Sequence, residues 1–454
     1  MRTTFLFLFL FLFSAFNSAL SQPNVQAGKI NKAKMAQRVR QEFLHAWNAY
    51  KQYAWGHDEL KPLNKSYRDW HAVSLYMTPI DAMDTMILMG LTDEAAKTKE
   101  FVVKNLSFDH DIEVKNFEVV IRLLGALLSN YQLTEDKRLL ALADDLGTRL
   151  LPVFNSPTGM PYMYVNLKTG AVRGVVTNPA EIGTLLVEFG ALSKLTGNPI
   201  YYDKAKRALV EVYNRRSSIG LVGTWINVET GAWTDSTSHI SACIDSYYEY
   251  LLKCWRLFDD NDCERMWRAS IDALNKYVAH DAATGFWYAR VNMFTGQRVE
   301  TSFGALDAFF PAVLAFSGDL NRAKRLQESC YKMWTAFGIE PERLDYATMK
   351  VTDGVYHLRP EIIESAYYLC HFTKDSRYLE MGRTFFDNLV RYCKTDAGYA
   401  ALSNVETKEK KDEMESFFLA ETLKYLYLLF APPETIDLTR VIFNTEAHPI
   451  RMTW

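Results

Sequence analysis

Two glutamates at the start of an apolar segment are the residues of this sequence best suited to chemistry. Glu361 and Glu364 follow Arg359 and Pro360 and stand among aliphatic and aromatic residues. Proline suits the first turn of a helix, where no amide hydrogen is needed, so we predict a buried helix that begins here. Residues three apart share a helix face, and a buried carboxylate is costly unless it is paired. The two acids therefore either favour the helix start and pair with Arg359 or line an active site.

Two further segments carry acids in apolar or aromatic surroundings. Glu118 and Arg122 are four residues apart and are flanked by Val, Ile and Leu, which is typical of a structural ion pair. Burial raises a carboxyl pKa and a nearby guanidinium lowers it, which is how proteins tune a general acid. Asp245 precedes a cluster of tyrosines that would suit sugar faces, although such a cluster is more often core. Both segments are candidates for a site.

A polar turn follows the last predicted helix. Its residues Thr445 and Glu446 supply hydroxyl, carbonyl and carboxylate oxygens, which are the ligands that a hard cation such as calcium prefers. Asn, Thr and Pro are also ordinary turn residues. A metal site and a plain turn both remain open on this evidence.

The sequence lacks the usual cofactor and nucleophile motifs. We find no phosphate-binding glycine loop, no dinucleotide fingerprint, no H-E-x-x-H and no G-x-S-x-G. Many acids with no cofactor motif indicate hydrolysis by paired carboxylates, and glycoside hydrolysis is the main chemistry of that kind.

A repeated pattern of segments indicates how these residues are positioned. Seven strongly apolar segments, each with an acid near its start, alternate with seven amphipathic helices, a spacing typical of helical repeats. The apolar segments begin near residues 79, 117, 179, 239, 302, 359 and 413, and their acids are Asp81, Glu118, Glu181, Asp245, Asp307, Glu361 and Glu415. The amphipathic helices lie near 31–54, 92–105, 135–151, 199–215, 261–279, 319–335 and 375–393. We predict an inner and an outer ring of helices, with the acids converging at one mouth. Loops near 155–175 and 221–237 are expected to form hairpins at the rim.

The bulk properties exclude some partners and suggest a compartment. The net charge is -3 with both signs mixed, which argues against nucleic acid or an anionic membrane. A basic start and the apolar run 5–16 predict a signal peptide over residues 1–21, with an uncleaved anchor as the alternative. Residues 22–454 would then form one catalytic domain, periplasmic or secreted, or in the ER lumen of a eukaryote. The six cysteines lack close C-x-x-C spacing, so we expect buried free thiols rather than zinc.

Several strings together carry a resemblance to a known family. They are 54–60 (AWGHDEL), 81–85 (DAMDT), 117–122 (FEVVIR), 245–252 (DSYYEYLL), 359–365 (RPEIIES), 414–425 (MESFFLAETLKY) and 443–449 (FNTEAHP). On these strings the chain resembles glycoside hydrolase family 47, the class I α-1,2-mannosidases. The similarity covers about residues 35 to 450 in the family order.

The resemblance implies a fold, an activity and roles for individual residues. The fold would be all-α, an (α/α)7 barrel plugged by a small C-terminal β-hairpin. The activity would be that of a calcium-dependent inverting exo-α-1,2-mannosidase acting on high-mannose glycans. Glu118 would be the general acid, acting through a water, Glu361 the general base and Asp245 the third catalytic carboxylate, to which the acid role is sometimes given. Thr445 would bind Ca²⁺, and the terminal mannose or the ion's water shell would be held by Arg122, Arg359, Glu364, Phe417, Glu421 and Glu446. A monomer is expected, with no nucleic-acid partner and no membrane anchor once the signal is cleaved.

The chain also departs from the processing members of the family. Ala308 and Phe310 stand where those members carry His and Cys, so their disulfide is not expected and Cys330 would lack a partner. Segments 181–189 and 306–311 are closer to the ER-degradation-enhancing mannosidase-like branch or to short bacterial relatives. Two alternatives therefore stay open: a non-catalytic, lectin-like glycan-binding protein on the same barrel, and a helical scaffold with no site.

Overall fold

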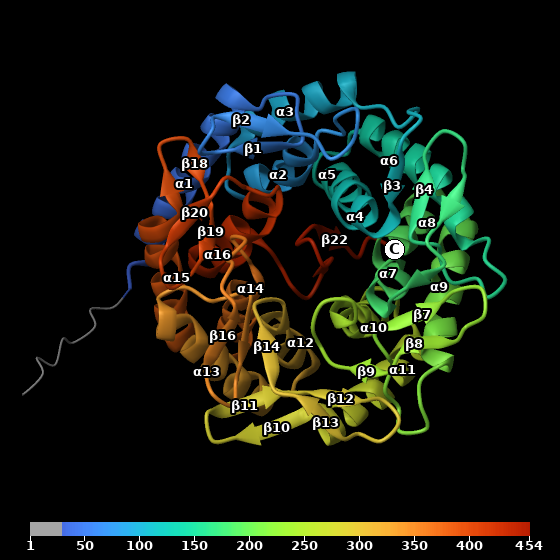
Figure 1. The fold of residues 1–454 in the computed structure, drawn as a ribbon. Coiled ribbons are helices and arrows are strands. Elements are labelled where there is room, and N and C mark those ends of the chain that lie inside the picture. Colours follow the sequence, from blue (N-terminus) through green and yellow to red (C-terminus); the bar gives the residue numbers. More distant parts are fainter. Residues whose placement is uncertain (1–29) are drawn as a thin grey trace, which may run out of the picture.

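A computed structural model describes residues 30–454, and the predicted signal peptide lies outside this range. The helices form two concentric rings around a central axis (Figure 1). The inner ring contains α2 (Met77–Leu88), α4 and α5 (Asn116–Val119 and Gly125–Thr134), α7 and α8 (Pro179–Gly183 and Leu186–Thr196), α10 (Asp245–Phe258), α12 (Phe310–Ser317), α14 (Glu361–Thr373) and α16 (Leu423–Phe430). The outer ring contains α1 (Lys32–Tyr53), α3 (Thr92–Asn105), α6 (Lys137–Leu150), α9 (Pro199–Asn214), α11 (Asn261–Ala273), α13 (Leu320–Phe337) and α15 (Arg377–Cys393). The predicted (α/α)7 barrel is confirmed.

The helices of the two rings differ in their pattern of buried residues, as their sequences predict. Residues 310–315 of α12 and residues 186–193 of α8 are buried without interruption, because an inner helix packs against both the outer ring and the barrel centre. On the outer helix α15 the buried residues recur on one face: Tyr378, Met381, Phe385 and Leu389 are among them. Within residues 30–454, no helix is both long and apolar enough to cross a membrane.

The starts of the helices also differ between the rings. Several outer helices begin with an Asn or Asp whose side chain accepts a hydrogen bond from the first turn, as Asn31 and Asp136 do, which is the usual N-cap. The inner helices α10 and α14 have no side-chain cap and begin instead with Asp245 and Glu361. The partial positive charge at these two helix starts favours acidic groups there.

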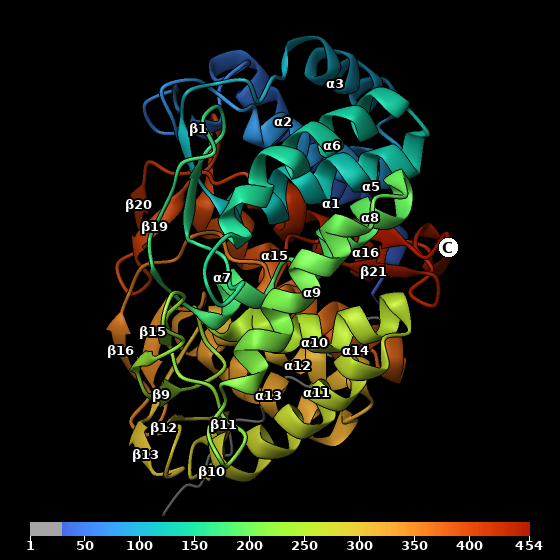
Figure 2. The same ribbon diagram turned by 90° about the vertical axis from the view of Figure 1, so that its right-hand side faces the viewer.

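Short strands link the helices, mostly on one side of the barrel. The left edge of Figure 2 shows β15, β16, β19 and β20, on the side opposite the C-terminus. The strands before the C-terminal hairpin are β1 (Glu59–Lys61), β2 (Ser66–Arg68), β3 (Glu113–Lys115), β4 (Tyr164–Asn166), β5 (Val172–Arg173), β6 (Val176–Thr177), β7 (Trp225–Asn227), β8 (Trp233–Asp235), β9 (Thr237–Ser238), β10 (Ala279–Ala282), β11 (Gly285–Tyr288), β12 (Arg290–Asn292), β13 (Arg298–Glu300), β14 (Ser302–Gly304), β15 (Arg343–Asp345), β16 (Lys350–Asp353), β17 (Lys394–Thr395), β18 (Gly398–Tyr399), β19 (Ala401–Asn404) and β20 (Glu409–Lys411). The expected hairpins near 155–175 and 221–237 are confirmed as β4–β5 and β7–β8.

Some predicted boundaries of the inner helices are wrong. The segment expected to begin near 239 becomes helical only at Asp245, and that expected near 302 opens with strand β14 and a 3-10 turn, Leu306–Phe309. The last inner helix is preceded by a π-helical turn, Phe418–Thr422, rather than starting near 413. Each of these segments lies at the rim before a helix and buries apolar residues without being helical. Its hydrophobicity therefore resembles that of the helix that follows.

A C-terminal β-hairpin fills the barrel centre, as expected. Strands β21 (Val441–Phe443) and β22 (Pro449–Arg451) pair antiparallel, with Ile442 opposite Ile450. Figure 1 places β22 inside the inner ring. Val441, Ile442, Phe443 and Ile450 are buried, so the hairpin closes one end of the barrel with an apolar plug and presents its turn, residues 444–448, to the interior.

Candidate active site

A cavity of about 510 Å³ lies on the barrel axis above the hairpin turn. Its lining includes all ten residues selected from the sequence: Glu118, Arg122, Asp245, Arg359, Glu361, Glu364, Phe417, Glu421, Thr445 and Glu446. They come from five different segments of the chain, which the two rings and the plug bring together. The reading as a helical scaffold with no site is therefore wrong.

The acids at the helix starts converge only in part. Glu118, Glu181, Asp245 and Glu361 line the cavity. The other three have partners elsewhere: Asp81 contacts His448 and Ser416, Asp307 accepts from the Gly304 amide, and Glu415 pairs with Arg68. An acid near a helix start therefore either lines the cavity or binds a partner elsewhere, because the N-terminal end attracts carboxylates whether or not it faces the cavity.

Two of the predicted catalytic carboxylates bind protons unusually tightly. Desolvation raises the pKa of Glu361 to about 7, against the attraction of Arg359. Desolvation also raises the pKa of Asp245 to about 7, and Glu249, Asp307 and Glu361 add repulsion. One oxygen of Glu361 is buried and has no hydrogen-bond partner. An acid that lines a cavity and has a pKa near neutral suits proton transfer.

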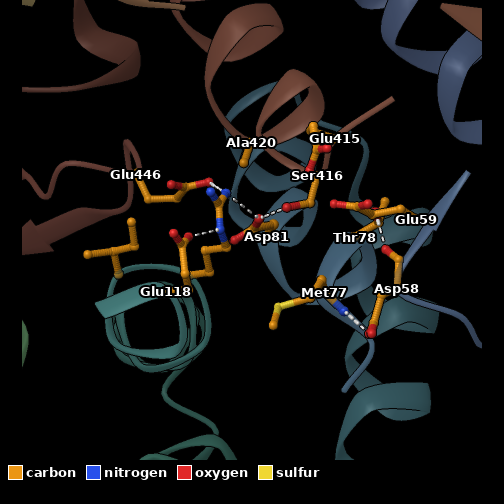
Figure 3. A network of polar contacts seen from close by, with 12 residues as sticks. Asp58, Glu59, Met77, Thr78, Asp81, Glu118, Glu415, Ser416, Ala420 and Glu446 are labelled. Atoms are coloured by element: carbon orange, nitrogen blue, oxygen red, sulfur yellow. Dashed lines mark hydrogen bonds and ion pairs between the residues drawn. The ribbon is translucent and has the colours of Figure 1, made fainter. Parts of the chain in front are cut away.

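Glu118 lies at a distortion in its helix. A π-helical turn, Val120–Leu124, separates α4 from α5, and such turns are frequent at functional sites. The predicted pair forms: Arg122 Nε donates to Glu118 Oε2 at 3.2 Å. The same guanidinium also binds Glu446 and lies 3.8 Å from Asp81 Oδ2. Figure 3 shows Glu118, Asp81 and Glu446 gathered around this point.

Arg359 pairs with a residue that the sequence did not single out. Its Nη2 lies 2.8 Å from Glu342 Oε1 and its Nε donates to the other oxygen at 3.2 Å, a two-point contact that fixes the guanidinium plane. Phe417 lies between two cations, with its ring centre 5.7 Å from the guanidinium carbons of both Arg122 and Arg359. Phe417 thereby sets the spacing of the two arginines along the wall of the cavity.

The hairpin turn is held rigidly beneath these groups. Asn444 Oδ1 accepts from the amides of Glu446 and His448, and its Nδ2 donates to the carbonyl of Ile121 at 2.8 Å. Lys424 Nζ donates to the Ala447 carbonyl at 2.6 Å. The first two contacts brace the turn internally, and the contacts with Ile121 and Lys424 tie it to the inner ring. Thr445 and Glu446 therefore keep a fixed position at the cavity floor.

The donor set at the floor fits a hard cation. Desolvation raises the pKa of Glu364 and of Glu446 to about 8. It also raises the pKa of Glu421 well above its usual value, with added repulsion from Glu446, Glu361 and Glu364. Carboxylates that repel one another in this way beside Thr445 would be stabilised by positive charge. Among residues 30–454 no three Asp, Glu, His or Cys side chains are close enough to hold a metal directly. A cation here would therefore take oxygens of Thr445 and reach the carboxylates through water.

The sequence reasoning missed several residues at the cavity. Lys115 lines its mouth and contacts Glu181 at 2.7 Å and Glu118 at 3.6 Å. Glu249 also lines the cavity and pairs with buried Lys253. Both pairs could have been suspected, because Lys115 stands three residues before Glu118 and Lys253 four after Glu249, the spacings of helical neighbours.

Comparison with known proteins identifies the family. Residues 42–452 match the model for glycosyl hydrolase family 47. The chain belongs to this family. It is 38% identical to alpha-mannosidase I MNS5 of Arabidopsis thaliana, over 95% of this chain and 79% of that protein. It is also 38% identical to ER degradation-enhancing alpha-mannosidase-like protein 2 of Mus musculus, over 91% and 77% of the respective chains.

A solved structure supports the assignment of the fold. An alpha-1,2-mannosidase from Trichoderma reesei superposes with a TM-score of 0.85 at 29% identity, covering 92% of this chain and 99% of that one. In keeping with the missing family Cys, Cys330 is a buried free thiol, as are Cys254, Cys263 and Cys393, while Cys243 and Cys370 are half-buried and free. Phe310 instead packs edge-on against Tyr288, with ring centres 4.8 Å apart.

Proposed function

We propose that this member of glycosyl hydrolase family 47 is a calcium-dependent, inverting exo-α-1,2-mannosidase that trims terminal mannose from high-mannose glycans. The observation that carries the proposal is the convergence of three separate carboxylates, two arginines and the Thr445 turn in one cavity. The relatives named above and the Trichoderma reesei structure are mannosidases or mannosidase-like by name, which supports the choice of sugar. The plug at one end supports action on chain ends, because a closed cavity admits a terminal sugar only.

The proposed roles follow from where each carboxylate lies. Glu361 acts as the general base: it lines the cavity that an attacking water would enter, and burial raises its pKa to about 7. Glu118 acts as the general acid through a water, and Arg122 fixes its orientation. Asp245 is the third carboxylate, and its raised pKa allows it to hold a proton near neutral pH. Carboxylates on different inner helices can leave room for water between them, as inversion requires.

The remaining residues bind and orient the sugar. Phe417 offers a ring face between Arg122 and Arg359, and Glu364, Glu421 and Glu446 accept hydrogen bonds from hydroxyl groups or from the water shell of the ion. Ca²⁺ held by Thr445 would supply positive charge at the floor that binds sugar hydroxyls and favours a distorted ring. We propose that the protein acts in the secretory pathway as a monomer with one catalytic domain over residues 22–454. The ER named for the Mus musculus relative and the predicted signal peptide support this location.

A product assay tests this proposal. Incubation of the protein and Ca²⁺ with α-1,2-linked mannobiose should release mannose, seen first as the β anomer by ¹H NMR. Glu361→Gln should lower kcat by about 10²- to 10⁴-fold, the usual contribution of a general base, without loss of fold by circular dichroism. Chelation should abolish turnover and added calcium should restore it. An α anomer would refute inversion, and full activity after exhaustive chelation would refute the metal.

The second candidate is a lectin-like protein that binds such glycans without cleaving them. The presence of ER degradation-enhancing alpha-mannosidase-like relatives keeps this candidate in view. Calorimetric binding of the disaccharide with no mannose released over hours would favour it. The presence of Glu118, Asp245 and Glu361 together in the cavity argues for turnover, because binding alone requires no general acid or base.

A further inference from the structure

A line of buried charges lies behind the cavity, with His448 at its centre. His448 Nδ1 is 2.7 Å from Asp84 Oδ2, and Nε2 is 3.2 Å from Asp81 Oδ1. The three side chains are fully buried. An ionised carboxylate accepts hydrogen bonds but donates none, so both ring nitrogens must donate. This geometry indicates an imidazolium that compensates two buried carboxylates.

One arm of this cluster leads into the cavity. The other oxygen of Asp81 accepts a hydrogen bond from Ser416 and lies 3.8 Å from Arg122 Nη1. Arg122 in turn binds Glu118 and Glu446. Figure 3 shows Asp81 between Ser416 and the cavity residues Glu118 and Glu446. Arg122 thus interacts with three acids: Glu118, Glu446 and Asp81. Asp81 also has a second cationic partner, His448.

The other arm leads to the hairpin turn. Asp84 Oδ1 is 2.8 Å from Lys424 Nζ, and both side chains are fully buried. Lys424 also donates to the carbonyl of Ala447 at 2.6 Å. Because His448 itself ends the turn, the cluster holds residues 444–448 at two points, Ala447 and His448, directly after Thr445 and Glu446.

We propose that His448 is a positioning residue that sets both the cation-binding turn and the general acid. Its positive charge satisfies Asp81, which leaves Arg122 free to orient Glu118 and Glu446, and its contact with Asp84 anchors the turn. Without this charge, buried Asp81 would draw Arg122 towards itself, because a buried ion left without its partner is strongly unfavourable. The part of the inference that concerns calcium and catalysis rests on the proposed function.

The first test is His448→Gln, which keeps a similar shape and removes the charge. Calcium affinity measured by calorimetry on the free protein should fall by about 10- to 100-fold, as for other residues that orient metal ligands. We expect kcat to fall by a similar factor while KM changes by less than about threefold, because the acid is misplaced and the sugar contacts remain. Unchanged calcium affinity and kcat would overturn the proposal.

A double variant separates charge compensation from shape. Asp81→Asn in the His448→Gln background removes the uncompensated carboxylate, so kcat and calcium affinity should recover part of the loss. A role in packing alone predicts that the second substitution makes both worse. Leu139→Ala, in the buried face of outer helix α6, is the matched control: it lowers the melting temperature through a cavity and should leave calcium affinity unchanged.

Hydrogen exchange of the metal-free protein needs neither calcium nor substrate. His448→Gln should speed exchange of the amides of residues 446–448, which the wild type protects through Asn444. Faster exchange together with a wild type that neither binds calcium nor cleaves mannobiose would sink the proposed function and leave the anchoring role standing. Exchange equal to that of the wild type would overturn the anchoring role itself.

Discussion

When Glu361 ionises, the metal-free protein should become less stable. Replacing Glu361 with a residue that cannot ionise should therefore stabilise the protein, by an amount that depends on pH. Burial raises its pKa from 4.5 to about 7. A raised acid pKa means that the folded state holds a proton which the unfolded chain has released. The stability associated with that proton is complete below pH ~4.5 and is lost as pH rises through the folded value.

The size of the effect follows from the shift. At ~1.36 kcal/mol per pKa unit, the full penalty at pH 8 is about 3 kcal/mol, against about 1 kcal/mol at pH 5. Glu361→Gln removes this penalty, so the stability gained by the substitution should grow by about 2 kcal/mol between these pH values. Residues 30–454 have an unfolding entropy of about 0.9 kcal/mol per kelvin, at roughly 2.1 cal/mol/K per residue. The melting temperature difference from wild type should therefore widen by about 2 °C.

Scanning calorimetry in chelator at pH 5 and pH 8 measures this difference. Glu406→Gln, at an exposed position between β19 and β20, serves as the control and should shift neither transition. If the Glu361→Gln difference is the same at both pH values, Glu361 does not hold its proton more tightly in the folded state and the reasoning fails. A widening that disappears when calcium is added would show that the cation relieves the same repulsion.

Three further predictions concern the surroundings of the site. Gly125→Ala places a methyl group 2.5 Å from Asn444 Nδ2, so the turn must shift, and calcium affinity measured by calorimetry should fall although no charge changes; an unaltered affinity would show that the turn tolerates displacement. Lys253→Met leaves Glu249 buried without its cation and should lower the free energy of unfolding by about 3–5 kcal/mol in denaturant titrations, a loss that Glu249→Gln in the same background should reduce. Tyr425→Phe removes the hydroxyl that donates to Glu364 Oε1 at 3.1 Å, so the pKa of Glu364 should rise above about 8 in a ¹³C-carboxyl NMR titration of the metal-free protein; a lower value would contradict the assigned donor.

The sequence predicts contacts between residues that are close in the chain better than contacts between residues that are far apart in it. The period of apolar residues predicts seven helix pairs, because an inner helix must be apolar all round and an outer one on a single face. The ten site residues were found through short strings and family resemblance, and they do share one cavity. Local spacing also marks pairs such as Glu118 with Arg122, which form as expected.

Partners distant in the chain could not be predicted in this way. Pairing of Arg359 with the acids that follow it was one of two alternatives, and it binds instead Glu342, directly before β15. His448 lies 364 residues from Asp84, and no periodicity connects a turn residue with an inner helix so far away. Helix starts near 239 and 302 were misplaced because rim segments bury apolar residues without being helical.

The position of the hairpin in the chain imposes an order of assembly. Thr445 and Glu446 follow all seven helix pairs, and α1 packs against α16 to close the ring. During synthesis, the ring cannot close before α16 has emerged, and its axis stays open until β21 and β22 enter it. A growing chain therefore holds Glu118, Asp245 and Glu361 without a floor beneath them. The protein should acquire its sugar-binding pocket in one late step, and a chain cut before residue 441 should fold its helices yet remain inert.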